Sequence, residues 1–163
     1  MSLSPEVKAA IAKRSRTKGS NYERTVAKKI ATYFGWKWDD CFIRTSLSSY
    51  AQPHGDLRPI NEMKNLWEGA KLGPLECKSR KEWSYENLLK NPIESTVVGY
   101  WLKSNKDTNC QNSIVVFTKP AISDMVLHAD DGCYNGPTIR FTIDGIPLII
   151  QTLKHFLESH WAK

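Results

Sequence analysis

The pattern of apolar and polar residues predicts two helices at the start of the chain. Ser4 and Pro5 are typical of a helix N-cap and first helical position, so a short helix should begin there and end near the basic residues that follow. A second helix should begin after Gly19, because Ser20-Asn21-Tyr22-Glu23 has the form of a capping box. Apolar side chains then recur at helical spacing until Gly35 ends the helix: Tyr22, Val26, Ala27, Ile30, Tyr33 and Phe34.

Shorter apolar runs and turn residues predict the remaining elements. We expect three strands at residues 41–45, 56–60 and 74–78, with the segment 61–73 a long loop between the second and the third. A helix interrupted at Asn91-Pro92 should follow over residues 82–106, and then a buried strand over residues 114–118. A short helix should follow Pro120, and after it come a turn at 130–132, a strand at 138–143 and a last helix at 149–161. The order predicts an α/β fold with a mixed central sheet flanked by helices.

Composition is typical of a single globular domain. The chain has 163 residues, of which 40% are hydrophobic, and we divide it into a basic N-terminal arm (1–19), a core (20–118) and a C-terminal extension (119–163). It has neither a membrane-spanning run nor a signal peptide, and its four cysteines lack the spacing of a zinc site or disulfide framework. We therefore expect a cytoplasmic protein without a membrane partner.

Positive charge is concentrated in the first quarter of the chain. Residues 1–37 contain nine Lys and Arg side chains and two Glu, whereas the remaining 126 residues contain 14 basic and 15 acidic side chains. Such a basic cluster is typical of proteins that bind nucleic acid. The candidate DNA-binding residues are Arg14, Arg16 and Lys18. The alternative is a solvated helix face or a tail whose charge keeps the protein soluble.

Two acidic residues and a lysine form the candidate catalytic cluster. In a strand Leu75-Glu76-Cys77-Lys78, side-chain alternation directs Glu76 and Lys78 to one face. Asp56 begins the preceding strand and would approach Glu76 if the two strands pair as a hairpin. Converging carboxylates favour Mg²⁺ or Mn²⁺, and such an ion beside a lysine suits phosphodiester hydrolysis. The alternative is a charged, exposed strand face without catalytic function, because short patterns of this kind are common.

The order of these motifs resembles the PD-(D/E)XK nuclease superfamily. The matching segments are Lys18-Gly19-Ser20, Glu23-Arg24, Arg44-Thr45-Ser46, Gly55-Asp56 and Glu76-Cys77-Lys78. Over about residues 13–118 the chain is similar to archaeal-type Holliday junction resolvases and their viral relatives. The resemblance implies a restriction-endonuclease-like αβββαβ core with a C-terminal extension. It also implies a homodimer, since a four-way DNA junction presents two equivalent strands to cut.

The resemblance assigns metal binding and catalysis to single residues. Asp56, Glu76 and the backbone carbonyl of Cys77 would bind Mg²⁺, for which Mn²⁺ would substitute. Lys78 would orient the nucleophilic water. The side chain of Cys77 should be a small core residue, because it faces away from Glu76.

Three further residues receive roles from the resemblance. Glu23 would be a catalytic residue that supports a metal-bound water or a second metal ion, and Arg44 and Ser46 would contact DNA near the scissile phosphate. Glu23 also has a structural interpretation as the reciprocal member of the capping box. Trp67 should be a core or interface residue, with stacking on an unpaired base as the alternative.

These observations predict a Mg²⁺-dependent Holliday junction resolvase acting in DNA recombination and repair. Two alternatives stay open: another PD-(D/E)XK endonuclease of nicking, repair or restriction-like type, and an inactive module that binds nucleic acid. The presence of Asp56, Glu76 and Lys78 argues against an inactive module, because a protein that only binds gains nothing from acidic groups where phosphate must approach.

Overall fold

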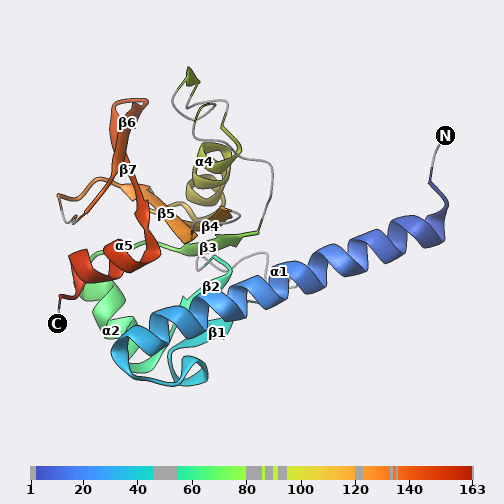
Figure 1. Ribbon diagram of the computed structural model, residues 1–163, viewed down its shortest axis with the longest axis horizontal. Coiled ribbons are helices and arrows are strands. Elements are labelled where there is room, and N and C mark those ends of the chain that lie inside the picture. The colour runs from blue at the N-terminus through green and yellow to red at the C-terminus, as the bar shows by residue number, and fades with distance from the viewer. Residues whose placement is uncertain are drawn as a thin grey trace.

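The structure is a computed structural model that describes residues 3–45, 55–79, 86, 90–91, 95–119, 123–132, 134 and 136–162. Within these residues a seven-stranded mixed sheet is flanked by helices, which confirms the predicted α/β fold (Figure 1). The helices are α1 (Pro5–Phe34), the short 3-10 helix η1 (Trp38–Asp40), α2 (Asn61–Gly69), α4 (Thr96–Thr108) and α5 (Leu153–His160). The strands are β1 (Phe42–Arg44), β2 (Leu57–Pro59), β3 (Leu75–Lys78), β4 (Ile114–Lys119), β5 (Ser123–Ala129), β6 (Ile139–Ile143) and β7 (Ile146–Thr152).

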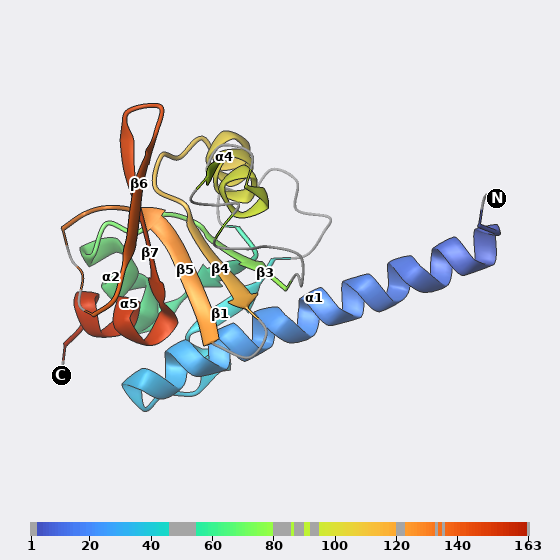
Figure 2. The same cartoon turned by 45° about the horizontal axis from the view of Figure 1, so that its top comes forward.

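The sheet has the strand order β1-β2-β3-β4-β5-β7-β6. Strands β3 and β4 pair in parallel, with Glu76 opposite Val115 and Cys77 opposite Val116, while the other neighbours pair antiparallel. The parallel pair is joined by a crossover that contains α4, as parallel strands require. Figure 2 shows α4 beside β3 and β4, on the other side of the sheet from α1.

Helix α1 is one continuous helix, so the prediction of two helices is wrong. The predicted ends are correct: the Ser4 side chain accepts a hydrogen bond from the N–H of Val7, and Gly35 has a left-handed φ of 74°. Between them, Gly19 and Ser20 lie inside the helix. An interior glycine costs about 1 kcal/mol, whereas ending one helix and starting a second would require a new and unfavourable nucleus.

The two halves of α1 have different surroundings. Its C-terminal half packs on the sheet through buried side chains, namely Tyr22, Val26, Ala27, Ile30 and Ala31. Its N-terminal half projects beyond the sheet into solvent (Figures 1 and 2). Val7 and Ile11 are exposed there despite being apolar, as is Leu3 just before the helix. The basic arm is therefore a helical projection of the domain.

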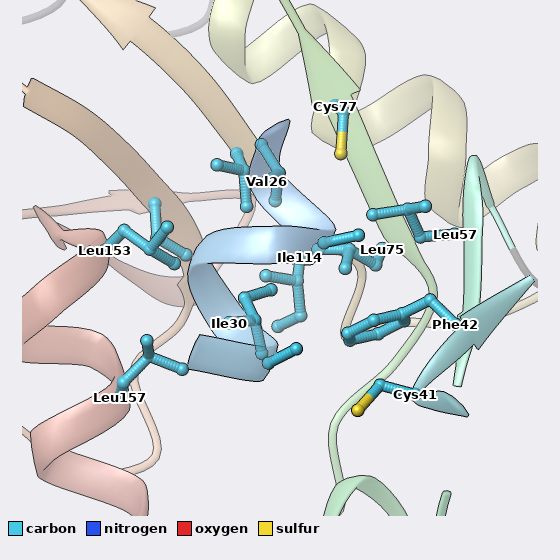
Figure 3. Close-up of a cluster of buried hydrophobic side chains, with 14 of the residues drawn as sticks. Val26, Ile30, Cys41, Phe42, Leu57, Leu75, Cys77, Ile114, Leu153 and Leu157 are labelled. Carbon is cyan, nitrogen blue, oxygen red and sulfur yellow. The ribbon is translucent and has the colours of Figure 1, made fainter. Parts of the chain in front are cut away.

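Two buried clusters lie on opposite faces of the sheet. The first contains side chains from α1, β1, β2, β3, α2 and α5 and is shown in Figure 3. The second lies under α4 and contains Val97, Val98 and Trp101. Alternation along β4 supplies both clusters, because Val116 belongs to the first and Val115 to the second. Strand β4 is thus buried on both faces, as its apolar sequence predicts.

Three predicted elements differ from those observed. The segment 61–73, expected to be a loop, contains α2, and residues 123–129, within the short helix expected after Pro120, form β5. Residues 149–152, expected to be helical, belong to β7, so the last helix begins at Leu153. Both misassigned strands lie inside the sheet and are covered on both faces, so neither shows a clear period-two alternation of apolar and polar residues.

Two further predictions from the sequence concern disulfide bonds between the cysteines and membrane-spanning segments. Cys41, Cys77 and Cys110 are free thiols, and the first two are buried. Within the described part of the chain, none of the helices combines the length and apolarity needed to cross a bilayer.

Candidate active site

Asp56, Glu76 and Lys78 come together where β2 meets β3. Glu76 and Lys78 point to the same side of β3, because the side chain of Cys77 between them is buried in the first cluster. Asp56 directly precedes β2, and its main-chain N–H donates to the carbonyl oxygen of Leu75 at 2.8 Å. The hairpin-like approach of the two strands thus places all three side chains at one point of the sheet.

Gly55 makes this close approach possible. Its φ of 69° lies in the left-handed region. A Cβ atom at this position would lie 2.6 Å from the carbonyl oxygen of Leu75. Any side chain here would therefore be strained and would also collide with the backbone of β3. The glycine before Asp56 is required for the aspartate to reach Glu76 and Lys78.

The lysine contacts both acidic residues. Lys78 Nζ lies 2.9 Å from Glu76 Oε2 and 3.4 Å from Asp56 Oδ2. Asp56 Oδ2 also accepts a hydrogen bond of 2.8 Å from the main-chain N–H of Cys77. This main-chain contact fixes the orientation of the aspartate, so the cluster is organised before any ligand binds.

Burial and mutual charge shift the pKa values in this cluster. Burial, together with the charge of Asp56, raises the pKa of Glu76 to about 7. Burial lowers the pKa of Lys78, but the neighbouring charges of Asp56 and Glu76 more than offset this, so its pKa lies above the ordinary value. Lys78 is therefore protonated. Ionisation of Glu76 is disfavoured by its burial and by the nearby charge of Asp56.

Glu23 and Arg44 form an ion pair at the margin of the cluster. Arg44 Nε on β1 donates to Glu23 Oε2 on α1 at 2.7 Å. Burial raises the pKa of Glu23, although the hydrogen bond from Arg44 opposes this shift. Because Glu23 lies inside α1, it cannot be a capping-box residue, and that structural interpretation is wrong.

Comparison with known proteins bears directly on this cluster. A family model described as "Phage putative PDDEXK endonuclease" matches residues 14–154, which include Glu23, Asp56, Glu76 and Lys78. The chain belongs to this family. Its membership in the PD-(D/E)XK nuclease superfamily, predicted from the sequence, is therefore confirmed. Searches among curated proteins and among solved structures gave no match.

PD-(D/E)XK nucleases typically use divalent metal ions, and the donor atoms here fit such an ion. Asp56 and Glu76 offer hard carboxylate oxygens, and a bound cation would favour the ionised form of Glu76, whose pKa is raised by burial and then by the charge of Asp56. In the described ranges, no three or more His, Cys, Asp or Glu side chains are grouped to hold a metal. The protein ligands would be these two carboxylates and the carbonyl of Cys77, whose role stays a prediction.

The predicted DNA-binding residues of this PD-(D/E)XK nuclease fall into two groups. Arg14, Arg16 and Lys18 are exposed on the projecting half of α1. Arg44 lies at the site but is paired with Glu23, and Ser46 lies outside the described residues. The structure therefore places Arg14, Arg16 and Lys18 on the helical projection and Arg44 of β1 beside the carboxylate cluster.

Two aromatic residues, Trp67 and Tyr100, differ in their relation to the candidate site of this nuclease. Trp67 is buried, and its indole Nε1 donates to the carbonyl of Gly73 at 2.8 Å, so it is a core residue and not a surface for base stacking. Tyr100 on α4 places its ring 5.3 Å from Lys78 Nζ. This second contact could not be predicted from the sequence, because the apolar stripe of that helix includes Trp101 but not Tyr100.

Proposed function

We propose that this chain is a divalent-metal-dependent endonuclease that cuts branched DNA, with the four-way junction as preferred substrate. The observation that carries the nuclease assignment is the contact of Lys78 with both Asp56 and Glu76, in a chain that belongs to a PD-(D/E)XK endonuclease family. The preference for junctions is the resolvase-like part of the proposal and rests on the sequence motifs.

The side chains divide the chemistry among them. A divalent cation, when bound, would polarise the attacking water and offset the charge that develops on phosphorus. Asp56 and Glu76 would hold it, with Asp56 kept in place by the main-chain N–H of Cys77. Lys78 would donate a hydrogen bond that orients the attacking water. Glu23 would accept a hydrogen bond from water at the margin of the site.

The shape and charge of α1 support a branched substrate. Arg14, Arg16 and Lys18 lie on a helix that extends away from the cluster (Figure 2). A linear duplex at the catalytic residues would meet one face of the domain, whereas a junction offers a second arm of phosphates to a cationic projection. We also propose a homodimer, because two sites related by twofold symmetry match the two equivalent strands of a junction.

Substitution of the cluster tests the nuclease assignment. Asp56→Asn, Glu76→Gln and Lys78→Ala should each abolish cleavage in Mg²⁺ while DNA binding is largely retained, because none of them removes the basic projection. Cleavage is measured on labelled DNA and binding by mobility shift without metal. Cleavage at a near wild-type rate by any of the three variants would contradict the assignment.

A panel of DNA structures tests the substrate. Four-way, flap, nicked and linear DNA of one sequence should be cut with the four-way junction preferred, and unlabelled junction should compete far better than unlabelled duplex. Equal competition by linear duplex would favour the restriction-like alternative. Binding without cleavage of any substrate, in Mg²⁺ or Mn²⁺, would favour the inactive binding module. Analytical ultracentrifugation tests the dimer, and a strictly monomeric protein bound to a junction would contradict it.

A further inference from the structure

The Lys78 ammonium has an aromatic neighbour as well as two acidic ones. Its Nζ lies 5.3 Å from the centroid of the Tyr100 ring, within the range of a cation–π interaction. The same atom lies 2.9 Å from Glu76 Oε2 and 3.4 Å from Asp56 Oδ2. The ammonium is thus held between two carboxylates of the sheet and an aromatic ring of α4.

The position of the Tyr100 ring is determined by the core. The ring packs against the second buried cluster. The next residue, Trp101, is buried, and its Nε1 donates to the carbonyl of Ser113 at 3.0 Å. This hydrogen bond and the buried Val97, one turn earlier, fix how α4 is rotated and how far along the sheet it lies. The ring therefore has little freedom to leave Lys78.

A lysine side chain needs such a restraint at this place. Its four-carbon stem has many rotamers, and the side chain of Lys78 is 27% exposed. When the oxygens of Asp56 and Glu76 are used by another cation, the ammonium loses part of the attraction that holds it. A ring attracts the ammonium without using any of those oxygens.

We propose that Tyr100 is a positioning residue: its ring holds the Lys78 ammonium at the β2–β3 junction while Asp56 and Glu76 stay available to a divalent cation. The consequence for catalysis rests on the proposed nuclease function, whereas the contact itself does not. Tyr100 acts through Lys78 and need not touch DNA.

An NMR experiment on the metal-free protein tests the contact directly. Reductive methylation with ¹³C-formaldehyde keeps lysines positively charged and gives each a dimethyl signal, and Lys78→Arg identifies the signal of Lys78. The Tyr100 ring current should shift this signal upfield of the other lysines. Tyr100→Phe keeps the ring and should keep the shift, whereas Tyr100→Leu should abolish it. Retention of the shift in Tyr100→Leu would overturn the proposal.

Cleavage kinetics of the unmodified protein test the consequence. Tyr100→Phe should cleave within about 2-fold of wild type, and Tyr100→Leu should lower kcat at least about 5-fold with KM unchanged, the scale of one cation–π contact. Tyr134→Leu is the matched control, since it removes a ring 3.7 Å from the Arg140 guanidinium on the far edge strand β6. It should change neither the rate nor the Lys78 signal.

The outcomes separate this proposal from the proposed function. Equal kinetics for the Phe and Leu variants would overturn the positioning role, as would a loss of rate in Tyr134→Leu as large as in Tyr100→Leu. If Tyr100→Leu melts at a lower temperature, Tyr100→Met is a second ring-free variant for both measurements. If the wild type cuts no DNA, the nuclease assignment fails, while the NMR comparison still decides whether Tyr100 positions Lys78.

Discussion

The ion pair between Glu23 and Arg44 joins helix α1 to the edge strand β1 beside the carboxylate cluster. Glu23→Gln keeps an oxygen that accepts from Arg44 Nε but removes the negative charge. We expect the free energy of unfolding to change by less than about 1 kcal/mol, as for other partly exposed pairs. Cleavage should fall at least about 10-fold, the scale for losing an outer partner of a metal site.

The two measurements for Glu23 are urea unfolding and cleavage rate across a Mg²⁺ titration. Arg44→Lys is the companion variant, because it keeps the positive charge but not the guanidinium geometry. Full activity of Glu23→Gln at every Mg²⁺ concentration would make Glu23 a structural residue and reduce the site to Asp56, Glu76 and Lys78.

His128 on β5 makes stability depend on pH. It is buried, its Nδ1 lies 2.8 Å from the carbonyl oxygen of Ala129, and its Nε2 accepts from the Gln151 amide at 3.0 Å. Burial lowers its pKa to about 4, and the charge of nearby His160 adds to this while Asp131 opposes it. The folded state therefore holds a neutral imidazole over the pH range in which an unfolded histidine becomes protonated.

The sign follows from the lowered pKa. At pH 7 both states are mostly deprotonated; as pH falls below about 6.5 the unfolded state binds the proton first, so stability decreases. Between pH 7 and pH 5 the stability difference between wild type and His128→Gln should shrink by about 2 kcal/mol. Urea unfolding at several pH values measures it, and taking the difference removes contributions from Glu76 and other shared groups. Parallel pH profiles would show that His128 does not titrate in this way.

At the scale of elements, two substitutions test whether α1 is one continuous helix or two helices. For Ser20, the two structures predict changes in the free energy of unfolding of opposite sign. In one continuous helix, Gly19→Ala should stabilise by about 0.5–1 kcal/mol, because apart from the neighbouring backbone of the helix itself no described atom lies within 4 Å of where its Cβ would be. Ser20→Ala should stabilise by a few tenths of a kcal/mol, because alanine is the better interior helix former. Urea unfolding and far-ultraviolet circular dichroism measure both effects. If Ser20 were an N-cap, its replacement would instead cost about 1 kcal/mol.

The sequence predicted those elements whose signals are local. The N-cap at Ser4, the glycine end at Gly35 and the strand at residues 75–78 depend on a few neighbouring residues, and the structure has all three. Residues 123–129 and 146–152 depend on their neighbours in the sheet: each is covered on both faces, so its sequence resembles a buried helix.

The same distinction applies to the candidate site. Alternation along β3 was enough to place Glu76 and Lys78 on one face, and Asp56 was expected near them if the strand that it begins paired with β3 as a hairpin. The contact of Tyr100 with Lys78 joins strand β3 to helix α4 of the crossover that follows it, and its distance depends on how α4 packs. Packing of that kind has no short-range pattern in a single sequence.

At the scale of the whole molecule, the charged half of α1 should govern the salt dependence of DNA binding. Replacing Arg14, Arg16 and Lys18 with alanine should weaken binding and reduce the slope of log K against log salt by about 1 to 3, depending on how many of them contact phosphate. The cleavage rate at saturating protein should change little, because the carboxylate cluster is intact. Fluorescence anisotropy at several salt concentrations measures the slope.

A charge-matched control uses Lys64, Lys103 and Lys154. These exposed lysines each pair with an acidic residue one turn away on their own helix, so their replacement removes the same formal charge from other surfaces. An equal change of slope in both triple variants would mean that net charge, and not the projecting helix, attracts the DNA.

The first buried cluster joins the C-terminal half of α1 to the last helix, α5. Its members include Ile30 of α1 and Leu157 of α5 (Figure 3). At its margin, the ring of Phe34 lies 5.5 Å from that of Trp161. Because β3 packs on this cluster, the hydrophobic core beneath Glu76 and Lys78 is incomplete until Leu153 to Trp161 have been synthesised. On a translating ribosome, the apolar face of α1 therefore stays partly uncovered, and accessible to chaperones, until α5 has been synthesised and can pack on it.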